Sequence, residues 1–219
     1  MSGPPQPLTS PPDLWDPLVR ITHWGLAIVV LVNAVFSEGG SVTHVWLGWI
    51  GMALLVLRLV WGVLGPKEAR FSAFPPNPLR ALAHLRSLVA GRVRHYPSHN
   101  PAGAVMAYAL WAALIVVIGT GLLMTGGRTP MQVAREKAAV QAGDWSVLVT
   151  HTGPDADGAE ASEKGGNGST TKEVHGVAAN LILVLAVLHV AGVAIESRAM
   201  RRNLVAPMVA GRRKRGRRA

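Results

Sequence analysis

Four long apolar segments constrain this chain more than any other feature of its sequence. A helix needs about 20 mostly apolar residues to cross roughly 30 Å of hydrocarbon. The four segments span residues 21–37, 44–64, 103–125 and 174–195. The first is short, but a Pro-rich stretch with a single basic residue, Arg20, precedes it, which argues against a cleavable signal peptide. We therefore predict an all-α fold, an integral membrane bundle of four helices.

Composition narrows the chemistry that such a bundle can carry. The chain has 219 residues, a net charge of +10, 8 histidines and no cysteine. Without cysteine, the sequence excludes disulfides, thiolate metal sites, iron–sulfur clusters and covalently attached c-type haem. Histidine is then the only strong nitrogen ligand, and any haem has to be held by non-covalent contacts.

The distribution of Lys and Arg predicts which connections face the cytoplasm. The connection 65–102 holds six of these residues and the tail after Ile195 holds nine. The connection 37–43 holds none, and the connection 126–173 holds five beside seven acidic residues. We therefore expect both termini in the cytoplasm. The basic tail is expected to contact anionic lipid rather than nucleic acid.

Shorter sequence patterns predict how the rest of the chain is organised. The predicted parts are a disordered Pro-rich N-terminus (1–14), a four-helix membrane domain (15–200) and a basic cytoplasmic tail (201–219). Surface helices are expected over 78–89, at the inner membrane surface, and over 131–142. Asn100 followed by Pro101 is typical of a helix start. The Gly/Ser/Thr/Asp-rich segment 151–171 is expected to be flexible.

Four histidines lie within or at the edges of the predicted spans, where ionisable groups are costly and usually functional. If the chain begins in the cytoplasm, His23 lies near the inner face, and His44 and His175 lie near the outer face. His189 follows His175 by 14 residues, which places it about 21 Å deeper in the membrane. The prediction is therefore two pairs, an outer pair of His44 with His175 and an inner pair of His23 with His189.

Two b-type haems, each ligated by two imidazoles, explain all four histidines together. Fourteen residues leave His189 only about 40° from the face of His175, with small residues between them. Gly48 and Gly51 share the face of His44 and leave room for a flat macrocycle. Single histidines that bond between helices, and glycines that only pack helices, are the alternatives. A zinc or copper site is a weaker interpretation, because each pair supplies two ligands without a nearby carboxylate or thiol.

Two arginines are candidate partners for haem propionates. Arg58 lies 14 residues beyond His44 and so near the inner pair, and Arg20 lies just below His23. An arginine inside a membrane needs an anionic partner, and a propionate would serve. The alternative for Arg58 is that its side chain extends to the inner interface.

The remaining histidines are expected in loops, solvated or interfacial. They are His84, His95, His99 and His151. Of these, His84 and His99 are secondary candidates for lining a quinone or proton path.

These residues resemble the bacterial cytochrome b561 / nickel–iron hydrogenase b-type cytochrome family, membrane subunits with a cytochrome b/b6 domain. The resemblance is carried by WDPLVRITHW around His23, HVWLGWIGMALLVLRLVWG from His44, SHNPAGA from Ser98, VHGVAANLILVLAVLHVAGV from Val174 and NLVAPMVAGRRKR from Asn203. It extends from about Trp15 to Arg215, and the two histidines 14 residues apart in the last span are its most specific element. The chain departs from the family at Gly176, because relatives often have Glu at the position after the histidine that matches His175. An acidic group that would support this ligand is therefore in doubt.

The resemblance implies a haem–iron protein of a respiratory electron transport chain in the bacterial inner membrane. Its four matching histidines, His23, His44, His175 and His189, would ligate two haems in the pairing given above. Electrons would pass between membrane quinone, handled near the inner haem, and a redox protein such as a hydrogenase, a reductase or a cytochrome c. The acidic outer connection would steer that partner.

The sequence contains no catalytic triad, paired carboxylates or phosphate-binding loop, so we expect an electron-transfer subunit, a component of a quinone oxidoreductase without a substrate-converting site of its own. Ligation from both sides also leaves no open iron position for oxygen chemistry. One alternative is a haem-bearing anchor subunit of a hydrogenase or reductase complex. Another is a haem-free, His-lined transporter of a metal or small solute. The oligomeric state stays open, with a homodimer as one option.

Overall fold

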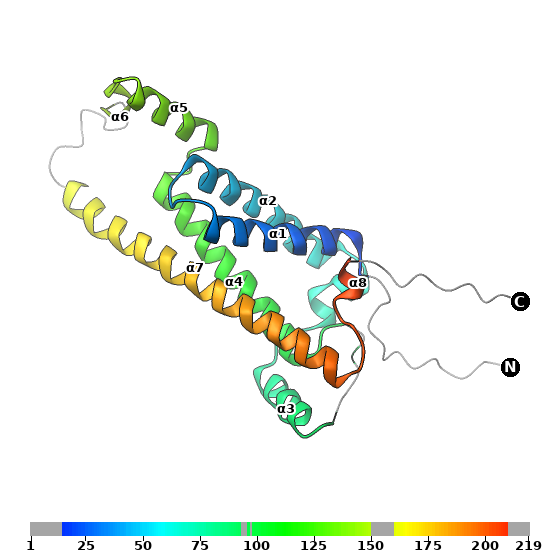
Figure 1. The fold of residues 1–219 in the computed structure, drawn as a ribbon. Helices are drawn as coiled ribbons and strands as arrows, with labels where there is room; N and C mark the ends of the chain where they lie inside the picture. Colours follow the sequence, from blue (N-terminus) through cyan, green and yellow to red (C-terminus); the bar gives the residue numbers. More distant parts are fainter. Residues whose placement is uncertain (1–14, 93–95, 97, 150–159, 210–219) are drawn as a thin grey trace, which may run out of the picture. The chain divides into compact units, whose positions relative to one another are not determined.

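The computed structural model describes residues 15–92, 96, 98–149 and 160–209, and the regular structure within these ranges is helical (Figure 1). The elements are α1 (Pro17–Val35), α2 (Val42–Leu64), η1 (Lys67–Ala69), η2 (Phe71–Ala73), α3 (Pro78–Val89), α4 (Pro101–Thr125), α5 (Pro130–Gln141), α6 (Ser146–Val149), α7 (Glu160–Ala199) and α8 (Ala206–Val209). The predictions for residues 1–14 and for the tail after 209 lie outside the described residues.

Four of these helices, α1, α2, α4 and α7, are long and apolar enough to cross a membrane. Many of their large apolar side chains are exposed, for example Ile28 at 57%, Leu123 at 73% and Val187 at 69%. Such exposure suits helices that face lipid, because the bilayer core is itself apolar. The prediction of an all-α, multi-pass membrane protein with four spanning helices is confirmed.

Two helix starts show how local sequence sets the bounds. The Asp16 carboxylate accepts hydrogen bonds from the backbone N–H of Leu18 and Val19, at 2.9 and 3.3 Å, so α1 begins earlier than hydropathy alone predicts. The Asn100 side chain accepts from the backbone N–H of Gly103 at 2.7 Å. The helix start predicted at Asn100 and Pro101 is therefore confirmed, because side-chain acceptors satisfy the free N–H groups of the first turn.

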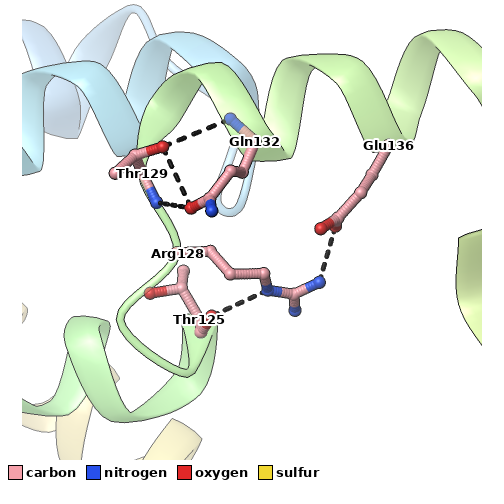
Figure 2. Close-up of polar contacts among 5 residues, drawn as sticks. All are labelled: Thr125, Arg128, Thr129, Gln132 and Glu136. Atoms are coloured by element: carbon pink, nitrogen blue, oxygen red, sulfur yellow. Dashed lines mark hydrogen bonds and ion pairs between the residues drawn. The ribbon is translucent and has the colours of Figure 1, made fainter. Parts of the chain in front are cut away.

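The predicted surface helix after the third span is α5, and Figure 2 shows how it is fixed. Thr129 and Gln132 form a reciprocal capping box, in which each side chain bonds to the other residue's backbone N–H (Figure 2). The Arg128 guanidinium donates to Glu136 at 2.6 Å and to the Thr125 carbonyl at 2.8 Å (Figure 2). These bonds tie α5 to the last turn of α4.

The last spanning helix is longer than predicted. α7 has 40 residues and begins at Glu160, so the prediction of a flexible segment over 151–171 is wrong from residue 160 onward. Residues 150–159 lie outside the described part of the chain. Once the apolar part of α7 is helical, each added residue gains a backbone hydrogen bond without forming a new helix nucleus. This cooperativity overrides the weak helix propensity of the Gly- and Ser-rich sequence.

The chain divides into two compact units. Unit 1 comprises residues 1–25, 55–112 and 183–219, and unit 2 comprises residues 26–54 and 113–182. Every spanning helix contributes one segment to each unit. Unit 1 contains α3 and α8, whereas unit 2 contains α5 and α6.

Inside unit 1, the connection after α2 is packed against the spans by aromatic rings. The Phe71 ring lies 5.2 Å from the Trp111 ring, centroid to centroid, and Phe74 is 2% exposed. A Cβ atom on Gly62 would lie 2.1 Å from Phe71, so only glycine lets this ring approach α2. The connection after α2 is therefore packed closely against α2 and α4.

Candidate functional site

Unit 2 brings together two of the predicted histidines. His44, near the start of α2, and His175, in α7, have ring centroids 6.1 Å apart and ring planes at 60°. Each ring is partly buried. Two imidazoles so close inside a spanning region need polar partners, because an unsatisfied polar group is costly there.

The hydroxyl of Thr120 in α4 orients the His175 ring. Its Oγ1 donates to the Val116 carbonyl at 2.7 Å and lies 3.0 Å from His175 Nδ1. With its proton on that carbonyl, the hydroxyl accepts a hydrogen bond from Nδ1. In this tautomer, Nε2 of His175 keeps its lone pair for a metal.

His44 is oriented in the same way by Ser37. The Ser37 hydroxyl lies 2.9 Å from the Asn33 carbonyl and 2.8 Å from the Asn33 side-chain oxygen, so its proton is already used. Its oxygen lies 3.3 Å from His44 Nδ1 and accepts from that nitrogen. Both rings of this pair thus have a hydrogen-bonded Nδ1 and an Nε2 available as a ligand. Neither hydroxyl belongs to a pattern that could be recognised in the sequence.

The two glycines predicted to make room for a macrocycle behave differently. Apart from the backbone of α2 itself, no atom of the described residues lies within 4 Å of a Cβ atom on Gly48, so the space beside it is open. A Cβ atom on Gly51 would lie 3.2 Å from the Val29 side chain of α1, so this glycine lets the two helices pack closely. The assignment of both glycines to a cofactor site stays a prediction. A further glycine, Gly121, lies against His175, where a Cβ atom would be 3.4 Å from the ring.

Unit 1 brings together the other two histidines. His23 in α1 and His189 in α7 have ring centroids 6.1 Å apart and ring planes at 55°. The Nδ1 atom of His23 is buried and has no hydrogen-bond partner within the described residues. A buried imidazole nitrogen without a partner is costly unless it binds something further.

The shared separation of 6.1 Å fits a metal ion between each pair. A metal lies about 2.0 Å from an imidazole nitrogen, which is itself about 1.1 Å from its ring centroid, so two axial ligands have centroids roughly 6.2 Å apart. Across the described residues, no group of three or more His, Asp or Glu side chains gathers to hold a metal ion. Each pair therefore suits a metal whose other ligands come from a macrocycle.

Arg58 is enclosed in unit 1 rather than extended to an interface. The residue is 5% exposed, and its guanidinium lies 5.0 Å from the Trp111 ring centroid and 5.9 Å from that of Phe71. Nη2 donates to the Ala69 carbonyl at 3.3 Å, whereas the buried Nη1 has no hydrogen-bond partner among the residues that the structure describes. The alternative of extension to the interface is thus contradicted. The free N–H groups on a buried cation suit an anionic group of a ligand.

Arg20 has contacts that the sequence does not predict. Its guanidinium donates to the backbone carbonyls of Met208 and Val209 at the end of α8. The indole N–H of Trp24 donates to the same Met208 carbonyl at 3.0 Å. Arg20 therefore holds the C-terminal segment against α1, and its assignment as a propionate partner stays a prediction.

A polar cluster that the sequence analysis missed lies elsewhere in unit 1. His84 is not a solvated loop residue but a buried residue of α3, and its Nε2 atom lies 3.5 Å from Oε1 of Glu196 in α7. The other carboxylate oxygen of Glu196 accepts a hydrogen bond from the Asn100 side chain. The sequence indicates the position of Glu196, because this residue follows His189 by seven residues, two helical turns on the same face. The predicted span ended at Ile195, however, and so did not include Glu196.

His99 also departs from the solvated position predicted for it. Its ring lies 4.4 Å from the Phe74 ring and 5.1 Å from the Trp15 ring, centroid to centroid. Burial, and then the Arg58 guanidinium, lower the pKa of His99 to about 4, so the ring is neutral at physiological pH. His95 and His151 lie outside the described residues.

One comparison with known proteins gives a match. The model of the prokaryotic cytochrome b561 family matches residues 14–211 of this chain, which include both histidine pairs and Arg58. No curated protein and no solved structure matches the chain. The match covers the same part of the chain as the resemblance seen in the sequence, and it confirms that resemblance.

Proposed function

The chain belongs to the prokaryotic cytochrome b561 family, and from this we propose that it is a membrane cytochrome with two haems b that transfers electrons between quinone and a redox protein. The family itself implies b-type haem and electron transfer. The proposal adds the number of haems and their ligands. His44 and His175 ligate one haem, and His23 and His189 ligate the other.

The observation that carries this proposal is the equal spacing of the two histidine pairs. Both have ring centroids 6.1 Å apart, close to the separation of two axial ligands of one iron. For His44 and His175, the hydroxyls of Ser37 and Thr120 also reserve Nε2 for the metal. A haem-free transporter would need neither the shared spacing nor these hydrogen bonds.

The side chains around each pair have distinct tasks in electron transfer. The bound haem iron supplies the one-electron chemistry. Two histidines would hold each haem iron, which would exclude other ligands and keep the ligand set the same in both oxidation states. The buried Arg58 supplies positive charge, with Nη1 available to a propionate of the haem at His23 and His189. The apolar spans provide a low dielectric that strengthens this charge effect.

The two sides of the membrane have different partners in this proposal. The connection 126–173, with seven acidic residues, faces the periplasm of a bacterial inner membrane and steers a basic or dipolar redox protein toward the haem of His44 and His175. Quinone reacts nearer the haem of His23 and His189. The connection 65–102 and the tail after Ile195 together hold fifteen Lys and Arg residues, which supports this orientation.

The purified protein is expected to contain two haems b per chain. Pyridine haemochrome titration against protein concentration measures the ratio and separates b-type from c-type haem. A ratio near two supports the ligand assignment, because each pair can hold one iron. A ratio of zero or one, or a covalent c-type spectrum, would contradict it.

Reporter fusions test the orientation of the chain. Alkaline phosphatase, which is active only in the periplasm, is expected to be active when inserted within residues 158–169 and silent when fused after Arg215. The excess of Lys and Arg on the cytoplasmic connections is the physical reason. The reverse pattern of activity would overturn both the orientation and the side on which the redox protein docks.

A further inference from the structure

The polar cluster of Glu196, His84 and Asn100 in unit 1 has no task in the electron transfer proposed above. Glu196 is 9% exposed and His84 is 5% exposed. The only ion-pair partner of the Glu196 carboxylate within the described residues is His84. A buried carboxylate is costly unless it is paired with a cation or protonated. A proton shared between these two groups lowers that cost.

Asn100 determines which carboxylate oxygen is available for that proton. Its side-chain oxygen caps α4 by accepting from the backbone N–H of Gly103, so its amide group must point the other way. That amide donates to Oε2 of Glu196, which is thereby held as an acceptor. The remaining oxygen, Oε1, lies 3.5 Å from Nε2 of His84. The proton therefore lies on the Oε1–Nε2 side of the carboxylate.

The cluster is close to one histidine pair along a single helix. Glu196 follows His189 by seven residues, which is two turns of α7 on the same face and about 10.5 Å along its axis. An electron added to the haem that His189 would ligate makes a proton at Glu196 more favourable, because opposite charges attract strongly where water is scarce. The two sites thus influence each other's charge.

We propose that the Glu196–His84 pair binds one proton from water when the haem ligated by His189 gains an electron, and releases it when the electron leaves. This inference rests on the proposed function. One electron enters from the donor, quinol, one proton enters the pair from the solvent, and the local net charge is unchanged. The carboxylate side chain retains 12% of its exposure, which gives water access to it.

The groups that face Glu196 come from three elements. α3 supplies His84, whose ring lies 5.5 Å from the Tyr96 ring, centroid to centroid. The start of α4 supplies Asn100, which carries no charge. α7 itself carries Arg198 two residues further on, where it is exposed and therefore screened by solvent. Glu196 and His84 are thus the ion pair that the described residues form in this cluster.

Redox titration of the purified holoprotein at several values between about pH 6 and 8 tests the inference. The midpoint potential of the haem at His189 is expected to fall as pH rises, by up to about 59 mV per pH unit, which is a tenfold change in a one-electron equilibrium. Glu196→Gln keeps the shape of the side chain but cannot bind the proton, so its slope should be flat. Glu196→Asp should keep the slope.

Two further variants complete the experiment. Glu68→Gln removes an exposed acid of unit 1 and should leave the slope unchanged. His84→Gln should move the slope to a different pH range, and it serves as the test if Glu196→Gln loses haem. A pH-independent potential in the wild type, or an unchanged slope in Glu196→Gln, would overturn the inference. A wild-type protein without haem would instead contradict the proposed function.

Discussion

Replacing His44 or His175 by alanine is expected to reduce the haem content from two to about one per chain, and both variants should retain the same haem. Replacing His23 or His189 should remove the other haem. Each iron loses one of two strong axial ligands, while the second pair keeps its own ligands and hydrogen bonds. Pyridine haemochrome titration gives the content, and reduced-minus-oxidised spectra show which haem remains.

Double variants provide the internal control for this pairing. His44→Ala combined with His175→Ala should lose no more haem than either change alone, because both act on the same site. His44→Ala combined with His189→Ala should remove both haems. If His44→Ala and His189→Ala instead abolish the same spectral component, the pairing is wrong.

Arg58→Leu is expected to lower the midpoint potential of the haem at His23 and His189 and to weaken its retention. Reduction removes one positive charge from the iron, so a nearby cation favours the reduced state, and its loss favours the oxidised state. A unit charge at ~10 Å in a protein interior contributes roughly 1–2 kcal/mol, which corresponds to about 40–90 mV for one electron. Redox titration of the variant measures the shift.

Arg58→Lys is the matched control, because it keeps the charge without the planar guanidinium. It should restore most of the potential but retain less haem than wild type, since Nη1 is lost as a donor to a propionate. The haem at His44 and His175 serves as an internal reference for correct folding. Normal haem content with an unchanged potential in Arg58→Leu would contradict a role for this arginine at the haem.

The spanning helices could be predicted from the sequence because the bilayer imposes one simple requirement, a long apolar helix. The bounds were less accurate where polar residues decide them. Asp16 extends α1 to Pro17, and helix propagation carries α7 back to Glu160, into sequence whose composition is typical of a loop. Hydropathy detects neither effect, since both depend on backbone hydrogen bonds.

The histidine pairs were predictable because depth in the membrane follows from position along a helix. The groups that support them were not. Ser37 and Thr120 are common polar residues, and only their distances to the rings reveal a role. His84 was misassigned because α3 turns it inward and leaves Leu79 and Val89 exposed, whereas its amphipathic pattern alone does not say which face is covered.

Both histidine pairs take one member from α7, the last of the four spans. A nascent chain that has inserted α1, α2 and α4 therefore holds His23 and His44 but no complete pair. Neither ligand set exists until α7 has left the ribosome and entered the bilayer. The contacts of Arg20 and Trp24 with α8 form later still, because α8 is synthesised after α7. Under the proposed ligation, we therefore expect haem to be loaded only after the membrane domain is complete.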